Sequence, residues 1–148
     1  MRWIALFLSA ALLSAQTAPK AATPAAAPKA GAAAAAPKPV ATSKQLMEIM
    51  LIPASEALFD VGSKEPKTDA DWAAVKKQAI ILAEGGQLLL VPGRAKPGVW
   101  NNTARQLMVA GAASVKAADE KNVDKIIEIG DQILMACEGC HKQYLPKK

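Results

Sequence analysis

Apolar side chains recur at steps of three and four residues in four stretches of the chain between Thr42 and Tyr144. This spacing places them on one face of an α-helix, and the sequence lacks the short alternating runs that are typical of strands. We therefore expect an all-α domain of four amphipathic helices. The first helix is expected to start after the cap Thr42 or Ser43 and to end near Val61. The second is expected to start after the cap Thr68 or Asp69 and to end near Leu90. The third would include Trp100 and end within the sequence KAADEKN, and the fourth would follow the cap Asn122 and end near Tyr144.

The apolar stripes also predict which face of each helix is buried. The second helix has a heptad-like stripe consisting of Trp72, Val75, Ala79, Leu82, Gly86 and Leu89. The fourth has a broader set of expected inward positions, Val123, Ile126, Ile127, Gly130, Ile133, Leu134 and Cys137.

Prolines mark where these helices bend or end. Pro53 falls inside the first helix, where it removes a backbone donor and crowds the carbonyl of Ile49, so a kink near Ile49 is expected. The sequence VPGRAKPG at 91–98 ends the second helix, and Pro146 stops the fourth. Short connections favour an antiparallel up-down-up-down four-helix bundle. The start of the first helix, the loop at 91–98 and the end of the fourth would then lie at the same end.

The N-terminal segment is typical of a secreted protein. Arg2 precedes an apolar run, Trp3–Leu13, and a small-residue site predicts cleavage of a signal peptide, residues 1–15, after Ala15, with Ala18 as an alternative. Residues 16–41 are Ala-, Pro- and Lys-rich and predict a disordered linker before a domain at 42–148. We expect a periplasmic protein with no membrane span in its mature form, tethered if the signal is not cleaved.

The charge of the domain is small. Four of the 18 basic residues precede residue 42, which leaves 14 basic against 13 acidic side chains in the domain. Because no basic patch is interleaved with aromatic residues, nucleic-acid binding is not expected. The sequence shows no acid–base pair or nucleophile array, so an enzyme is not expected either.

All the cysteine and histidine of the chain lie within the sequence CEGCH, as Cys137, Cys140 and His141. C-x-x-C-H is the signature for covalent attachment of c-type haem, in which both thiols bond to the porphyrin and the histidine binds iron. Three alternatives stay open: a redox dithiol, which lacks its βαβ context here; a zinc site, which lacks a fourth protein ligand; and a disulfide or buried thiols.

With this motif near the C-terminus of a secreted four-helix protein, the chain resembles the class II c-type cytochromes, which include cytochrome c′ and its low-spin relatives. The matching stretches are LMEIMLIPASEALFD, DWAAV, LAEGGQLLLVPGRA and CEGCHKQY. The resemblance implies one covalent haem c and a periplasmic one-electron carrier that meets redox partner proteins. The family often forms homodimers through its first helix, but the sequence itself does not give the oligomeric state.

The family divides on the sixth iron ligand. Low-spin members supply a methionine from the first helix, whereas cytochrome c′ leaves the position empty, and a five-coordinate haem would make the protein a binder or sensor of NO or CO. At 1.5 Å per residue, His141 lies about 6 Å from its helix end, Met47 about 6 Å and Met50 about 10 Å from the start of the first helix. Because Met47 and His141 lie at equal distances from their helix ends, Met47 is favoured as the sixth ligand, with Met50 as the alternative.

Further haem contacts follow from position. Cytochrome c′ places an arginine in the first helix for a haem propionate, but here the nearest basic residue is Lys44. Arg94, in the loop at the haem end, is the candidate in its place, and Lys142 is a second. Trp100 is expected first of all in the core, and at the haem end Trp100 and Tyr144 are candidates for packing against the porphyrin.

Overall fold

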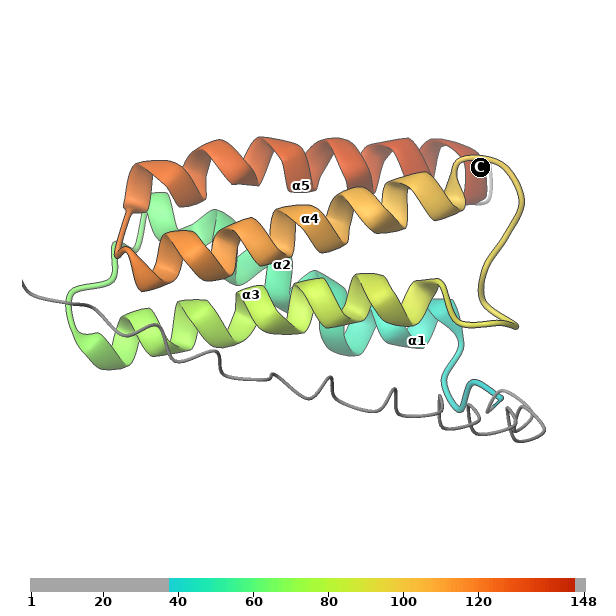
Figure 1. Cartoon of the computed structure of the whole chain (residues 1–148), viewed down its shortest axis with the longest axis horizontal. Coiled ribbons are helices and arrows are strands. Elements are labelled where there is room, and N and C mark those ends of the chain that lie inside the picture. Colours follow the sequence, from blue (N-terminus) through green and yellow to red (C-terminus); the bar gives the residue numbers. More distant parts are fainter. Residues whose placement is uncertain (1–37, 146–148) are drawn as a thin grey trace, which may run out of the picture. The chain divides into compact units, whose positions relative to one another are not determined.

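The computed structural model describes residues 38–145, which form four helices packed in sequence (Figure 1). No strand occurs within this range, so the all-α prediction is confirmed. The predicted signal peptide and residues 16–37 of the predicted linker lie outside it. The elements are α1 Ser43–Leu46, the π-helical turn η1 Met47–Leu51, α2 Ile52–Phe59, the 3₁₀ turn η2 Asp60–Gly62, α3 Asp69–Leu89, α4 Trp100–Asp119 and α5 Val123–Tyr144.

The helices form a bundle whose successive members run in opposite directions (Figure 1). α3 packs closely on α4 and α4 on α5, while α2 packs on both α3 and α5 and so closes the bundle. The start of α1, the α3–α4 loop and the end of α5 lie at one end, called the site end below. The α2–α3 and α4–α5 connections lie at the other, called the far end. Of the described helices, none has the length and apolar character needed to cross a membrane.

The predicted kink in the first helix is a π-helical turn. The N–H of Ile52 bonds to the carbonyl of Met47, five residues earlier, instead of to Glu48. Pro53 then falls in the first turn of α2, where a helix tolerates proline best. The sequence thus located the break correctly, and the wide turn is its physical form.

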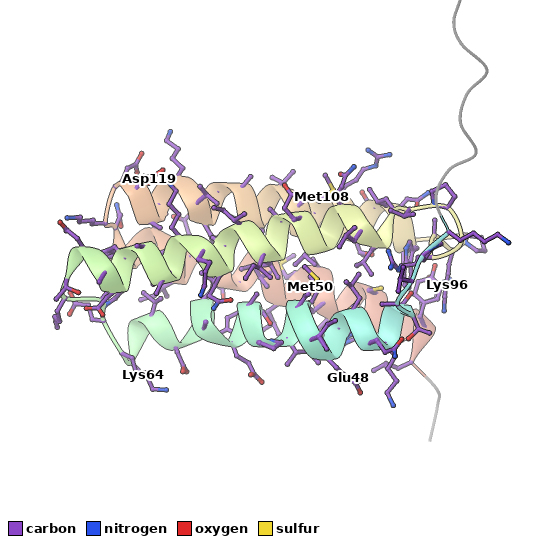
Figure 2. All side chains as sticks on the ribbon, turned by 90° about the horizontal axis from the view of Figure 1, so that it is seen from below. Glu48, Met50, Lys64, Lys96, Met108 and Asp119 are labelled. Atoms are coloured by element: carbon purple, nitrogen blue, oxygen red, sulfur yellow. The ribbon has the colours of Figure 1, made fainter. Side chains whose placement is uncertain are left out.

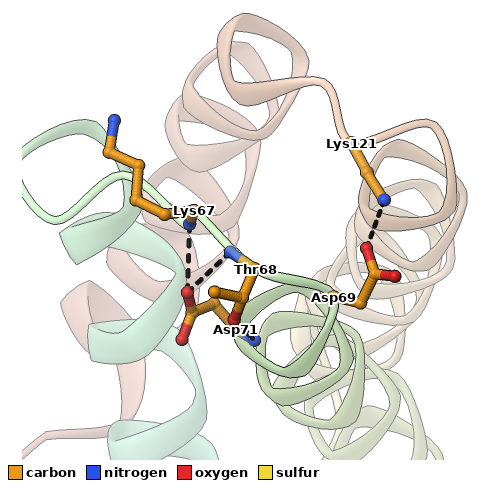
Figure 3. A network of polar contacts seen from close by, with 5 residues as sticks. All are labelled: Lys67, Thr68, Asp69, Asp71 and Lys121. Atoms are coloured by element: carbon orange, nitrogen blue, oxygen red, sulfur yellow. Dashed lines mark hydrogen bonds and ion pairs between the residues drawn. The ribbon is translucent and has the colours of Figure 1, made fainter.

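The start of α3 is fixed by a reciprocal capping box (Figure 3). The Thr68 hydroxyl accepts from the N–H of Asp71 at 3.1 Å, and the Asp71 carboxylate accepts from the N–H of Thr68 at 2.8 Å. Beside it, Lys121 from the α4–α5 connection pairs with Asp69 at 2.5 Å. Hydrogen bonding to Lys121, then its charge, lowers the pKa of Asp69, while the hydrogen bonds at Thr68 and Lys67 lower that of Asp71.

The close approach of α3 and α4 depends on a residue without a side chain. A Cβ added at Gly111 would lie 2.7 Å from the backbone nitrogen of Ala83. At Gly130 on α5, by contrast, the nearest atom would be a ring carbon of Phe59 at an ordinary 3.6 Å.

The stripe predicted for α3 is buried along its whole length, but the set predicted for α5 is partly wrong. Ile127 and Leu134 are 49% and 48% exposed, because they flank an open groove beside Phe59 instead of entering the core. The buried positions of α5 are Ile126, Ile129, Gly130, Ile133, Ala136 and Cys140.

Candidate functional site

At the site end, one pocket brings together residues from the first and last helices. Met47, Cys137, Cys140 and His141 all line it. The remaining lining is apolar apart from two hydroxyls, with Leu51, Ile52, Ser55, Leu82, Leu89, Thr103, Ala104, Leu107 and Ala136. This inner pocket is small, about 50 Å³.

A wider hollow of about 480 Å³ opens beside the inner pocket. Met47, Ile52, Cys140 and His141 line both spaces, so these four side chains form the boundary between them. The outer hollow continues to the surface past Ser43, Lys44, Glu48, Lys96, Trp100, Tyr144 and Leu145. The outer hollow is therefore apolar where it meets the inner pocket, with the Cys140 thiol in its wall, and polar where it opens to the surface.

The two predicted methionines differ in their relation to these spaces. Met47 lines both, whereas Met50 is absent from the described lining of either. Met50 and Met108 lie near the middle of the bundle, while Glu48 and Lys96 lie toward the site end (Figure 2). Of the two methionines, Met47 is the one that shares a pocket with the cysteines, and its role as an iron ligand stays a prediction.

The two thiols are free, with Cys140 buried and Cys137 half-buried. Burial raises the pKa of both, assisted at Cys137 by the neighbouring Cys140 and opposed at Cys140 by the Thr103 hydroxyl and the charge of Lys96. Both are therefore protonated at neutral pH. A redox-active dithiol requires the opposite, a thiol whose pKa is lowered toward neutrality.

Trp100 and Tyr144 form a fixed aromatic pair at the outer hollow. Their rings meet edge to face, with centroids 5.1 Å apart. The Trp100 indole donates to the carbonyl of Leu89 at 2.9 Å, while the Tyr144 hydroxyl donates to the carbonyl of Pro97 and accepts from the backbone N–H of Trp100. These bonds join the α3–α4 loop to the last turn of α5.

Arg94 is not among the described residues that line either space. It is buried, and its guanidinium donates to the carbonyls of Ala41 at 3.0 Å and Leu88 at 2.9 Å. Lys142 is exposed and pairs with Glu138 at 3.3 Å. The structure thus gives Arg94 other partners than the predicted propionate.

Two lysines line the outer hollow, Lys44 and Lys96, and the sequence reasoning missed Lys96. Its ammonium lies 5.2 Å from the centre of the Trp100 ring and 5.4 Å from that of Tyr144. Cation–π contacts of this kind hold a lysine over an aromatic surface. The available signal was its place in the same loop as Arg94, two residues further on.

These residues fit a covalently held haem. Two thiols, an imidazole and a thioether line one largely apolar pocket, and Lys44 and Lys96 line the hollow beside it, where they could pair with the carboxylates of a bound haem. The inner pocket alone is too small for a porphyrin, so the two spaces would have to merge around Met47 and Ile52. Among residues 38–145, no three His, Cys, Asp or Glu side chains are placed to hold a metal ion by themselves.

Comparison with known proteins yields no relative. No protein-family model matches the chain, and no curated protein or solved structure matches it either.

Proposed function

We propose that the protein is a periplasmic c-type cytochrome that carries single electrons on one covalent haem. Cys137 and Cys140 would attach the haem, with His141 and Met47 as the axial iron ligands. The observation that carries this proposal is the common pocket lined by all four of these side chains.

The attachment step needs no external oxidant or reductant. Each thiol S–H adds across one vinyl C=C of the porphyrin, so that sulfur bonds to one carbon and the hydrogen goes to the other. Cys137 and Cys140 follow one another at a three-residue step on α5, which puts both sulfurs on one face of the helix.

The other residues would bind and shield the group. Haem supplies a one-electron iron couple, whose potential rises with methionine ligation. The apolar lining, including Leu51, Leu82 and Leu107, keeps water from the pocket. Lys96 at the mouth of the outer hollow would meet a propionate carboxylate, and exposed lysines such as Lys142 would face redox partner proteins.

The first test is whether haem remains on the denatured chain. The full-length protein is produced in a bacterium whose periplasm attaches c-type haem, and is then denatured, stained for haem and weighed by mass spectrometry. We expect the mass of one haem on the wild-type chain and none on the Cys137→Ser/Cys140→Ser variant. A wild-type chain without added mass would overturn the proposal.

The second test separates the electron carrier from a binder of NO or CO. A sixth ligand from Met47 gives a low-spin ferrous spectrum that CO does not change. We expect this of the wild type and of Met50→Leu, whereas Met47→Leu should become high-spin and bind CO. A wild type that is high-spin and binds CO would instead indicate a cytochrome c′-like gas binder.

A further inference from the structure

The π-helical turn η1 changes the phase of the first helix. Leu46 and Leu51 are both buried, at 2% and 4% exposure, although they are five residues apart. Five residues of a regular α-helix turn the chain by about 500°, which would leave the two side chains about 140° apart. Both enter the core because the wide turn between them contains one extra residue.

The same shift decides which residue faces the candidate site. Met47 and Ile52, also five residues apart, line both the inner pocket and the outer hollow. If α2 continued backward as a regular helix, the residue sharing a face with Ile52 and Ser55 would be Glu48, at steps of four and seven. Met47 would instead follow Leu51 and Ala54, toward the buried side of the helix.

Two neighbouring features hold the turn in place. Pro53 has no N–H to give to the carbonyl of Ile49, and its ring would crowd that oxygen in a regular helix. On the facing helix, Gly85 leaves room for Leu51, since a Cβ added at Gly85 would lie 2.5 Å from a Leu51 methyl carbon. The extra residue is therefore both required by Pro53 and accommodated by α3.

We propose that Pro53 is a positioning residue: by imposing the π-helical turn it directs the thioether of Met47, instead of the carboxylate of Glu48, toward Cys137, Cys140 and His141. This inference rests on the proposed function in that Met47 serves as the axial ligand. Pro53 itself lines neither space in the described part of the chain and acts through the helix phase.

The test replaces Pro53 in the haem-loaded protein. Pro53→Ala frees the segment to become a regular helix, so we expect loss of the ferric methionine-to-iron charge-transfer band and new CO binding by the ferrous form, with the covalent haem retained. Pro92→Ala, an exposed proline in the α3–α4 loop, is the matched control and should behave as wild type. An unchanged band and unchanged CO response in Pro53→Ala would overturn the inference.

A compensating deletion sharpens the test. Removing Ile49, which is 66% exposed, from Pro53→Ala takes out the extra residue, so that Met47 stands four residues before Ile52 and shares its face in a regular helix. The charge-transfer band should return in this double variant. If it stays absent while helix content and covalent haem are normal, the helix phase does not control the ligand.

A further readout does not depend on haem. In a Leu46→Cys variant, alkylation at position 46 is located by peptide mapping, with and without Pro53→Ala. Because straightening would turn position 46 out of the core, we expect severalfold faster labelling when Pro53 is replaced, and equal rates would contradict the inference. Failure of the proposed function would appear separately, as absent haem or absent methionine ligation in the wild type.

Discussion

The two ends of the bundle are built differently. At the far end the connections are short, α3 begins in a capping box, and Lys121 pairs with Asp69 (Figure 3), while a groove beside Phe59 stays open toward the middle of the bundle. The site end contains two hollows, a broken first helix and a loop held by an aromatic pair. Within the described residues α1 approaches no other helix as closely as α2 approaches α3 and α5.

Core packing follows the same division. The large side chains with least exposure lie in the middle or the far half of the bundle: Leu58, Leu82, Ile126, Ile129, Ile133 and Val61. Close to the cysteines the buried set includes small residues, such as Ala104 and Ala136. Exposed ion pairs contribute little individually, so packing makes the larger difference. The most completely buried large side chains therefore lie away from the site end.

The largest effect is expected where packing is closest. Gly111→Ala would force α4 away from the backbone of α3 at Ala83, and overpacking of this kind costs about 1–3 kcal/mol. Gly130→Ala, which meets only an ordinary contact, should instead stabilise by about 0.5–1 kcal/mol through helix propensity. Urea unfolding of the two variants measures both, and equal changes would contradict the close packing described for Gly111.

The two capping boxes allow a direct comparison of the ends. Thr68 caps the long helix α3 and Thr42 caps the four-residue α1, each with a reciprocal side-chain bond. Thr68→Ala should lower the free energy of unfolding by about 1 kcal/mol. Thr42→Ala should lower it less, because α1 can open locally without unfolding the bundle. A larger loss at Thr42 would show that α1 is part of the cooperative core.

Removing a charge at the site end should change the midpoint potential of the proposed haem, whereas removing one at the far end should not. Lys96→Gln removes a positive charge beside the outer hollow, which should lower the midpoint potential because that charge favours the reduced form. Lys64→Gln, at the far end beside Asp60, should leave the potential unchanged (Figure 2). Equal potentials for Lys96→Gln and wild type in a redox titration would remove Lys96 from the site.

The smallest expected effect is on the stability of the protein at acidic pH. Because the pKa of Asp69 is lowered in the fold, its contribution is complete above its unfolded pKa of about 3.9 and is lost as the pH falls through the folded value. Wild-type stability should therefore decrease below about pH 4, and Asp69→Asn should reduce that dependence. Unfolding midpoints at a series of pH values test this, and an identical pH profile for the variant would exclude the pair as a contributor. Added salt should weaken the difference.

Much of the fold was predictable because helix signals are local. The Thr68 cap, the α3 stripe and the break before Pro53 each depend on a few neighbouring residues. The form of the break was not predictable, since proline shows that a regular helix cannot continue but not how the chain turns. Ile127 and Leu134 were assigned inward because an apolar residue signals burial, whereas the cover over them depends on how far α2 extends.

In the candidate site, too, the residues set by local sequence were predictable and those set by the course of a loop were not. A compact motif identified Cys137, Cys140 and His141, and helix rise put Met47 at their height. Which cations line the outer hollow depends on side-chain direction within a loop that has two positive-φ glycines, Gly93 and Gly98. Periodicity carries no information about such a loop, so the sequence named Arg94 as a haem contact and did not consider Lys96, which lines the hollow.

The contact between Arg94 and Ala41 has a mechanical consequence. Ala41 directly precedes Thr42, the cap of α1, and its carbonyl is held by a buried guanidinium that also grips the end of α3. Tension applied to the chain from its N-terminal side would meet this anchor first and pass into α3, which packs closely on α4. The short α1 and Met47 would thereby be shielded from the load.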